Sequence, residues 1–188
     1  MYPEYVQVGD KKYKINTSYK IALECDAISQ DTSISELKRA LAIIYKLFGR
    51  EALYDTTNRE MLLEKAFKYL LCGNEPSGEK RDVDFVKDMP YIRASFMSDY
   101  HITLNDDMHF WEFSELLNGL SNSELGNCCV FNRIRNLRNF DLSTIKDTKE
   151  REKIRKAKES VAIKKPKTMS YEQRESASAF YNEFYRKE

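Results

Sequence analysis

Hydrophobic residues recur at helical spacing along most of this 188-residue chain. In residues 108–120, four apolar side chains follow one another at steps of three, four and three: Phe110, Phe113, Leu117 and Leu120. This spacing places them on one face of a helix. Trp111, the single tryptophan of the chain, lies beside that face and widens it. The pattern predicts a central helix over residues 108–120 that other elements cover on several sides.

The flanking residues predict where this helix begins and ends. Asn105 suits the N-cap position, and Asp106 and Asp107 would then place negative charge in the first turn, where the helix dipole favours it. Gly119 marks the expected end of the helix.

Two further stretches combine a capping box with an apolar stripe that we expect to face inward. Ser33 and Glu36 precede the first stripe: Leu37, Leu41, Ile44 and Phe48. Thr57 and Glu60 precede the second: Leu63, Ala66, Phe67, Leu70 and Leu71. Gly49 and Gly73 follow the two stripes and predict the ends of the two helices.

The remaining pattern completes a helical fold. Short β-prone runs on either side of Gly9 predict a hairpin within about residues 2–15. Helices are expected from the caps at residues 16–18 to about 28, from Pro90 to about 100, over about 123–140 and over 146–162, with the polar run 73–80 as the best internal break. We predict a mainly α protein: a single helical domain of six to eight helices (residues 1–165) with a small N-terminal β-hairpin. A C-terminal extension (residues 166–188) follows, helical from about residue 170.

Composition narrows the class of protein. Hydrophobic residues make up 41% and charged residues 32% of the chain, as in soluble proteins. Six glycines and four prolines are few for a β-sandwich or barrel. No run of 18 apolar residues occurs, so we expect no membrane span, and the N-terminus lacks a signal-peptide pattern. The four cysteines are then expected to be free thiols in a reducing cytosol.

No arrangement of residues in the sequence predicts catalysis. His101 and His109 have no second His or Cys at metal-ligand spacing, and the cysteines form no C-x-x-C pair. No phosphate-binding glycine loop or nucleophile elbow occurs. We expect a non-enzymatic protein without metal or cofactor.

Charge is unevenly distributed along the chain. Residues 133–168 carry 13 Lys/Arg against 5 Asp/Glu, whereas residues 1–132 carry 15 against 21. Clustered positive charge suits nucleic acid, but no aromatic residue lies between Asp141 and Lys167 to stack on bases, and acidic residues dilute the field. A solvated helix is the favoured interpretation. A basic arm could also dock on the acidic body of another copy or of another protein.

Five stretches of the chain, taken in order, resemble one known family. They are Tyr13–Thr17, Lys68–Gly73, Asp84–Phe85 followed by Tyr91–Phe96, Met108–Leu120 and Asp141–Asp147. Their order and spacing across about residues 10–165 are similar to the "gene product fifteen" family of tailed bacteriophages, found in siphophages of Gram-positive bacteria. The family tends to carry an acid and an Arg where this chain has Ser18 and Lys20, and a Gly where it has His101.

The resemblance implies a part in tail assembly. Proteins encoded just before the tape-measure gene are regarded as chaperones that coat the tape-measure protein until tail-tube subunits replace them. Such a protein would act in the host cytoplasm and bind the tape-measure protein or other tail proteins, and a homo-oligomer is compatible with this role. Two alternatives stay open: a structural tail or connector component retained in the virion, and a nucleic-acid-binding protein that uses the basic 133–167 segment.

Two sets of side chains are candidates for binding the partner. The first is an apolar face at helical spacing near the C-terminus: Phe180, Tyr181, Phe184 and Tyr185. The second is a charged set on the basic helix: Arg151, Arg155 and Lys158. The aromatic face could instead pack on its own domain.

Overall fold

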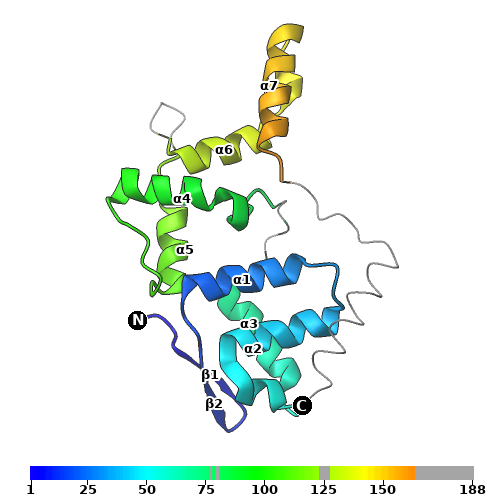
Figure 1. Cartoon of the computed structure of the whole chain (residues 1–188), viewed down its shortest axis with the longest axis vertical. Helices are drawn as coiled ribbons and strands as arrows, with labels where there is room; N and C mark the ends of the chain where they lie inside the picture. Colours follow the sequence, from blue (N-terminus) through cyan, green and yellow to red (C-terminus); the bar gives the residue numbers. More distant parts are fainter. Residues whose placement is uncertain (77, 79–80, 123–127, 164–188) are drawn as a thin grey trace. The chain divides into compact units, whose positions relative to one another are not determined.

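The computed structural model describes residues 1–76, 78, 81–122 and 128–163 (Figure 1). Most stretches with hydrophobic residues at helical spacing are helices in this structure. Its elements are β1 (Tyr5–Val8), β2 (Lys11–Lys14), α1 (Tyr19–Gln30), α2 (Glu36–Tyr54), α3 (Arg59–Leu70), α4 (Phe85–Tyr100), α5 (Phe110–Asn118), α6 (Val130–Asn139), the 3-10 turn η1 (Leu142–Thr144) and α7 (Thr148–Ser160). The described residues thus hold seven α-helices and one two-stranded hairpin, and the predicted mainly α class is confirmed.

These elements group into two compact units. Unit 1 comprises residues 1–76 and 106–112, and unit 2 comprises the described residues within 78–105 and 113–163. The first division falls after Pro76, inside the polar run that the sequence marked as the best internal break. The predicted boundary at residue 165, and the extension that follows it, lie outside the described residues and stay predictions.

The N-terminal hairpin forms as predicted and is tied to the helices of unit 1. Val8 pairs with Lys11, so Gly9 and Asp10 make a two-residue turn. Two isolated strands are marginal in water, and here the hairpin packs on α2 and α3. Asp55, at the end of α2, accepts hydrogen bonds from Tyr13 Oη (2.5 Å) and Lys11 Nζ (2.7 Å) on β2.

Helices α1, α2 and α3 pack in series to form the body of unit 1 (Figure 1). The buried side chains of α2 are Ile43, Ile44, Leu47, Phe48 and Ala52, and those of α3 are Leu62, Ala66 and Tyr69. Each large apolar side chain buried in this way contributes roughly 1.5–3 kcal/mol.

The caps of these two helices differ from those predicted. Ser35, not Ser33, is the N-cap of α2, and its Oγ accepts from the Lys38 N–H. Asn58, not Thr57, precedes α3. Gly49 interrupts the helix where its end was predicted, and residues 36–54 are two helical stretches joined at this kink. The φ of 80° and ψ of −169° of Gly49 belong to a region that is essentially restricted to glycine, and the helix then resumes for one more turn.

The predicted central helix is shorter than expected. It begins at Phe110 instead of Met108, because residues 106–109 form a turn and a short pairing with the start of α1. Phe110 N–H donates to Thr17 O (2.7 Å) and Tyr19 N–H to Met108 O (3.0 Å). Asp106 therefore lies outside the helix, where it pairs with Lys20. Gly119 follows the last helical residue, as predicted.

Aromatic residues cluster where α5 begins. His109 Nδ1 accepts from the Trp111 N–H (3.0 Å) and so caps the helix, and its other ring nitrogen lies 3.2 Å from Pro3 O. The Tyr69 ring stacks on the Trp111 indole, whose Nε1–H donates to Tyr69 O (3.0 Å). Tyr2 stacks on His109. This cluster fixes residues 106–112 and the N-terminus on α3 within unit 1.

Unit 2 is built on α4 and α6, which pack against one another (Figure 1). Ile92, Phe96, Phe113 and Phe131 form its fully buried core, and Phe96 stacks on Phe113. Helix α4 begins at Phe85, five residues before the predicted Pro90, because Asp84 caps it through the Lys87 N–H. It ends at His101, whose φ of 58° lies in the left-handed region.

Helix α6 begins at Val130 and not near residue 123. Its buried residues are Phe131 and Asn132, whereas the predicted inward residues Val130, Ile134 and Leu137 are half-buried. Asp141 caps η1 and Asp147 caps α7, and α7 has no buried residue. The basic helix is solvated, as its thin apolar stripe indicated.

Candidate protein-binding surfaces

Helix α7 carries the charged partner-binding residues predicted from the sequence, and Arg155 is at its centre. Its guanidinium donates to both carboxylate oxygens of Glu152 (2.7 and 2.9 Å) and to Glu159 Oε1 (2.7 Å). These hydrogen bonds hold the pKa of Glu152 below its usual value and raise that of Arg155. All three side chains are exposed to solvent, so the pairs contribute little to stability.

Arg151 and Lys158 bind backbone carbonyls near α7. Arg151 donates from Nε and Nη2 to Ile145 O (3.0 and 2.6 Å), and Lys158 Nζ donates to Phe140 O (2.6 Å). The structure thus places Arg151, Arg155 and Lys158 on one helix, and each has a local partner there. Their binding of a second protein stays a prediction.

The aromatic candidates cannot be placed in the same way. Phe180, Tyr181, Phe184 and Tyr185 lie outside the described residues. Their assignment as a docking face therefore also stays a prediction.

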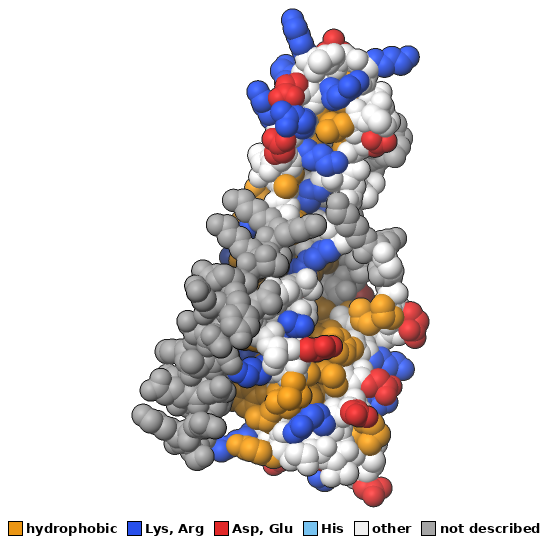
Figure 2. All heavy atoms as spheres, turned by 90° about the vertical axis from the view of Figure 1, so that its right-hand side faces the viewer, with side chains coloured by type: hydrophobic (Ala, Val, Ile, Leu, Met, Phe, Trp, Pro, Cys, Tyr) orange, Lys and Arg blue, Asp and Glu red, His pale blue; other side chains and the backbone are white. Residues whose placement is uncertain are grey.

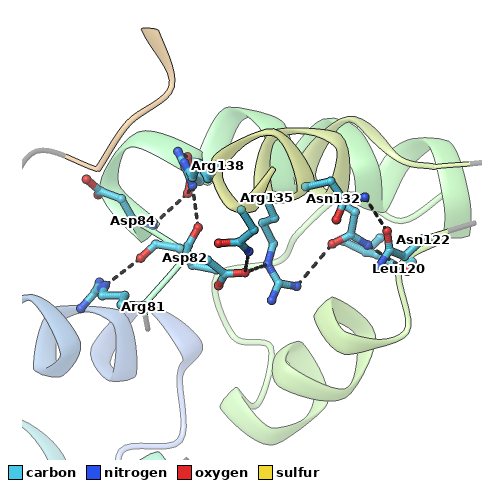
Figure 3. Close-up of polar contacts among 12 residues, drawn as sticks. Arg81, Asp82, Asp84, Leu120, Asn122, Asn132, Arg135 and Arg138 are labelled. Atoms are coloured by element: carbon cyan, nitrogen blue, oxygen red, sulfur yellow. Dashed lines mark hydrogen bonds and ion pairs between the residues drawn. The ribbon is translucent and has the colours of Figure 1, made fainter. Parts of the chain in front are cut away.

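Helix α6 uses much of its positive charge inside unit 2 (Figure 3). Arg135 Nε donates a hydrogen bond to Asp82 Oδ2 (2.8 Å). The Arg138 guanidinium donates to both carboxylate oxygens of Asp88 (2.6 and 2.7 Å). Arg138 also donates to Asp82 O (2.8 Å) and to Val161 O (2.7 Å). Internal acids therefore balance part of the positive excess that the sequence showed in this segment.

Amide side chains extend this polar network toward α5. Asn132, buried at the start of α6, donates from Nδ2 to Leu120 O (3.1 Å) and Ser121 O (3.2 Å). Asn136 Nδ2 donates to Asn122 Oδ1 (2.9 Å). Figure 3 shows the contacts of Asn132 together with those that Arg135 and Arg138 make to Asp82. The network is structural, because its members satisfy one another.

Sequence reasoning missed an apolar surface on α3. The predicted inward residues Phe67 and Leu71 are 43% and 36% exposed. Leu63 is half-buried and lies four residues before Phe67. Residues four apart on a helix are neighbours on its surface, so these three form a row, which we call the α3 stripe: Leu63, Phe67 and Leu71.

Helix α2 has a similar row. Leu37 and Tyr45 are 59% and 50% exposed, and half-buried Leu41 lies midway between them. We call Leu37, Leu41 and Tyr45 the α2 stripe. Figure 2 shows that hydrophobic side chains gather on one face of unit 1, with charged side chains around them. Contiguous apolar surface of this kind marks sites of protein association.

The sequence of α3 alone does not indicate which of its apolar residues face the core. Helix α3 has two apolar rows, Leu62, Ala66 and Tyr69 on one side and the α3 stripe on another. Only one of these two rows can face the core of a small unit. Both rows have helical spacing, so the spacing does not indicate which row is buried. The row that contains Tyr69 is buried because Tyr69 packs on Trp111.

Several observations concern the nucleophilic and metal-ligating side chains of the described residues. Burial raises the pKa of the Cys25 thiol to about 12, so it stays protonated and a poor nucleophile. Both ring nitrogens of His109 contact backbone. Within residues 1–76, 78, 81–122 and 128–163, no group of three or more His, Cys, Asp or Glu side chains has a metal-binding arrangement. No helix of that part is long and apolar enough to cross a membrane.

Comparison with known proteins identifies the family. No curated protein and no solved structure matches the chain. The family model described as bacteriophage Gp15 protein matches residues 2–163, which covers both units. The chain therefore belongs to the bacteriophage Gp15 protein family, and this membership indicates a structural or tail-related phage protein.

Proposed function

We propose that this protein is a non-enzymatic tail-assembly chaperone that binds the phage tape-measure protein in the cytoplasm of the infected bacterium. Family membership supports a phage protein that interacts with other phage proteins. One structural observation carries the binding role: α3 has two apolar rows, of which one forms the core and the other leaves Phe67 and Leu71 exposed.

The geometry of the α3 stripe suits a helical partner. Leu63, Phe67 and Leu71 follow one another at steps of four, which is the spacing of helix-in-groove recognition. A tape-measure protein is long and helical, and such chains need their apolar faces covered before assembly. Covering Phe67 and Leu71 would contribute roughly 1 kcal/mol each, since each is already partly buried. Several copies along one target would add these modest contributions.

The distribution of charge favours a protein partner over nucleic acid. In the basic segment, Arg135, Arg138 and Arg155 already form ion pairs with carboxylates of the same chain. Phosphate binding requires cations that can replace counterions, and these three arginines are engaged. The α3 stripe is apolar, which matches a polypeptide and not a phosphate backbone.

Co-expression with the tape-measure protein of the same phage tests the proposal. We expect the tape-measure protein to stay soluble and to co-purify with the wild-type chain. Phe67→Ser/Leu71→Ser should reduce the co-purified amount at least fivefold, and should lower the midpoint of thermal unfolding less than changes in the core row of α3, because both side chains are only partly buried. The matched control is Met61→Ser, an equally exposed apolar residue on another side of α3.

Co-purification that is equal for the double variant and the control would contradict the α3 stripe as the binding surface. A chain that never binds the tape-measure protein, yet co-purifies with tail-tube or connector proteins, would instead identify a structural component.

A further inference from the structure

The α3 stripe needs an occupant before any partner arrives, because exposed Phe and Leu rows promote aggregation. We propose that the aromatic residues Phe180, Tyr181, Phe184 and Tyr185 of the same chain bind the α3 stripe in the free protein and are displaced when the partner helix binds. The displacement step rests on the proposed chaperone function. The binding within one chain does not.

The chain outside the described residues supplies a suitable occupant. After Ile163, the last described residue, the sequence continues to Glu188 and carries four aromatic residues within six positions. Positions 180, 181, 184 and 185 fall on one side of a helical turn. These rings offer apolar area with few rotatable bonds, which lowers the entropy cost of binding.

The length of the connection permits this contact. Phe180 follows Ile163 by 17 residues, and with the predicted helix beginning at about residue 170 the extended part and the helical part together span at most roughly 40 Å. A unit of about 80 residues has a radius of gyration of about 12 Å. The span of the connection thus exceeds the radius of either unit.

The same connection favours the chain's own segment over that of a second copy. A short flexible tether gives an effective concentration in the millimolar range, whereas a second copy in solution is usually present at micromolar concentration. A contact of only a few apolar side chains is formed in most molecules at a millimolar effective concentration. At a micromolar concentration of a second copy it is formed in few of them. Such a weak contact is also one that a longer partner helix displaces.

Hydrogen exchange of the full-length chain tests the proposal without any partner. Binding of the aromatic segment should slow the opening of α3, so Phe180→Ser/Phe184→Ser should speed exchange of the amides of residues 63–72 by about two- to tenfold. Cys72 directly follows Leu71 and is half-buried, so its labelling by a maleimide, located by peptide mapping, should rise in parallel. The matched control is Tyr171→Ser, an aromatic residue nine positions before Phe180 and outside positions 180–185.

Combining the variants of the aromatic segment and of the α3 stripe separates loss of their contact from a general loss of folding. In the Phe67→Ser/Leu71→Ser chain, adding Phe180→Ser/Phe184→Ser should change exchange and labelling no further, because the contact is already absent. Unchanged protection of α3 in Phe180→Ser/Phe184→Ser would overturn the proposal. Protection that depends on protein concentration would also overturn it, by assigning the stripe to a second copy. Failure to bind a tape-measure protein leaves these measurements unaffected, so the two proposals fail separately.

Discussion

The guanidinium of Arg138 holds the buried carboxylate of Asp88 in a two-point contact, with N–O distances of 2.6 and 2.7 Å. Asp88 is completely buried, and it also accepts from the Asp84 N–H at the start of α4 (2.8 Å). Arg138 donates in addition to Val161 O, at the end of α7. One arginine thereby joins α4, α6 and the end of α7 inside unit 2.

Arg138→Met should lower the free energy of unfolding by about 3 kcal/mol, because it leaves the Asp88 charge buried without its partner. Asp88→Asn should cost a similar amount, and the two changes together should cost less than their sum. Urea unfolding followed by circular dichroism measures the differences. Exchange of α7 amides should also rise in Arg138→Met, since the Val161 contact is lost.

Arg133→Met is the matched control, because Arg133 is on the same helix but exposed. If Arg133→Met and Arg138→Met destabilise the protein equally, the buried pair is not the link that joins these helices.

His101→Gly should stabilise the protein by about 0.5–1 kcal/mol. His101 has a φ of 58°, where a side chain is strained and glycine is not, although glycine also gains entropy in the unfolded chain. His101→Ala should destabilise, because Ala tolerates this conformation less well than His. A decrease in the thermal midpoint for His101→Gly would contradict the account of this turn.

Gly119→Ala should cost about 1–2 kcal/mol. A Cβ at Gly119 would lie 2.8 Å from the Tyr100 hydroxyl, which donates to Leu116 O (2.9 Å). The hydroxyl would have to move and give up this hydrogen bond. In a Tyr100→Phe background the hydroxyl is gone, so Gly119→Ala should cost clearly less there. Equal costs in both backgrounds, from thermal unfolding, would exclude the close contact as the cause.

Asp55 should make unit 1 sensitive to acid. Hydrogen bonds from Lys11, Tyr13 and Asn58 hold the pKa of Asp55 well below its usual range. A lowered pKa in the folded protein adds stability above the unfolded value near pH 4, and this stability is lost as the pH falls toward the folded value. Between pH 7 and pH 3 the wild type should therefore lose more stability than Asp55→Asn.

Trp111 fluorescence during urea unfolding reports on the Asp55 effect, because Trp111 lies in unit 1. Asp10→Asn, in the hairpin turn, is the control and should follow the wild type. Parallel pH profiles for wild type and Asp55→Asn would show that this carboxylate does not link the hairpin to the helices.

Periodicity in the sequence was enough to predict the helices and the hairpin, but it could not choose between two apolar rows on one helix. In α3 the choice depends on Tyr69, which packs on Trp111 more than 40 positions away. The start of α5 shows the same limit. Asp106 and Asp107 suit a first helical turn, yet pairing of residues 106–109 with the start of α1 keeps Asp106 outside the helix.

The candidate binding residues were predictable to different degrees. The charge of Arg151, Arg155 and Lys158 could be read from the sequence, but not the acids and carbonyls that engage them, since these depend on where α7 begins and what lies beside it. The exposure of Phe67 could not be predicted, because an apolar residue at helical spacing indicates burial in most helices.

The measurement that tests the central claim most directly is quantitative mass spectrometry of infected cells and of purified virions from the same culture. A protein that binds the tape-measure protein only during assembly should co-purify with it from the lysate and be absent from finished particles, or present at less than about one copy per particle. A constant, multi-copy presence in finished virions would contradict the chaperone account and identify a structural component.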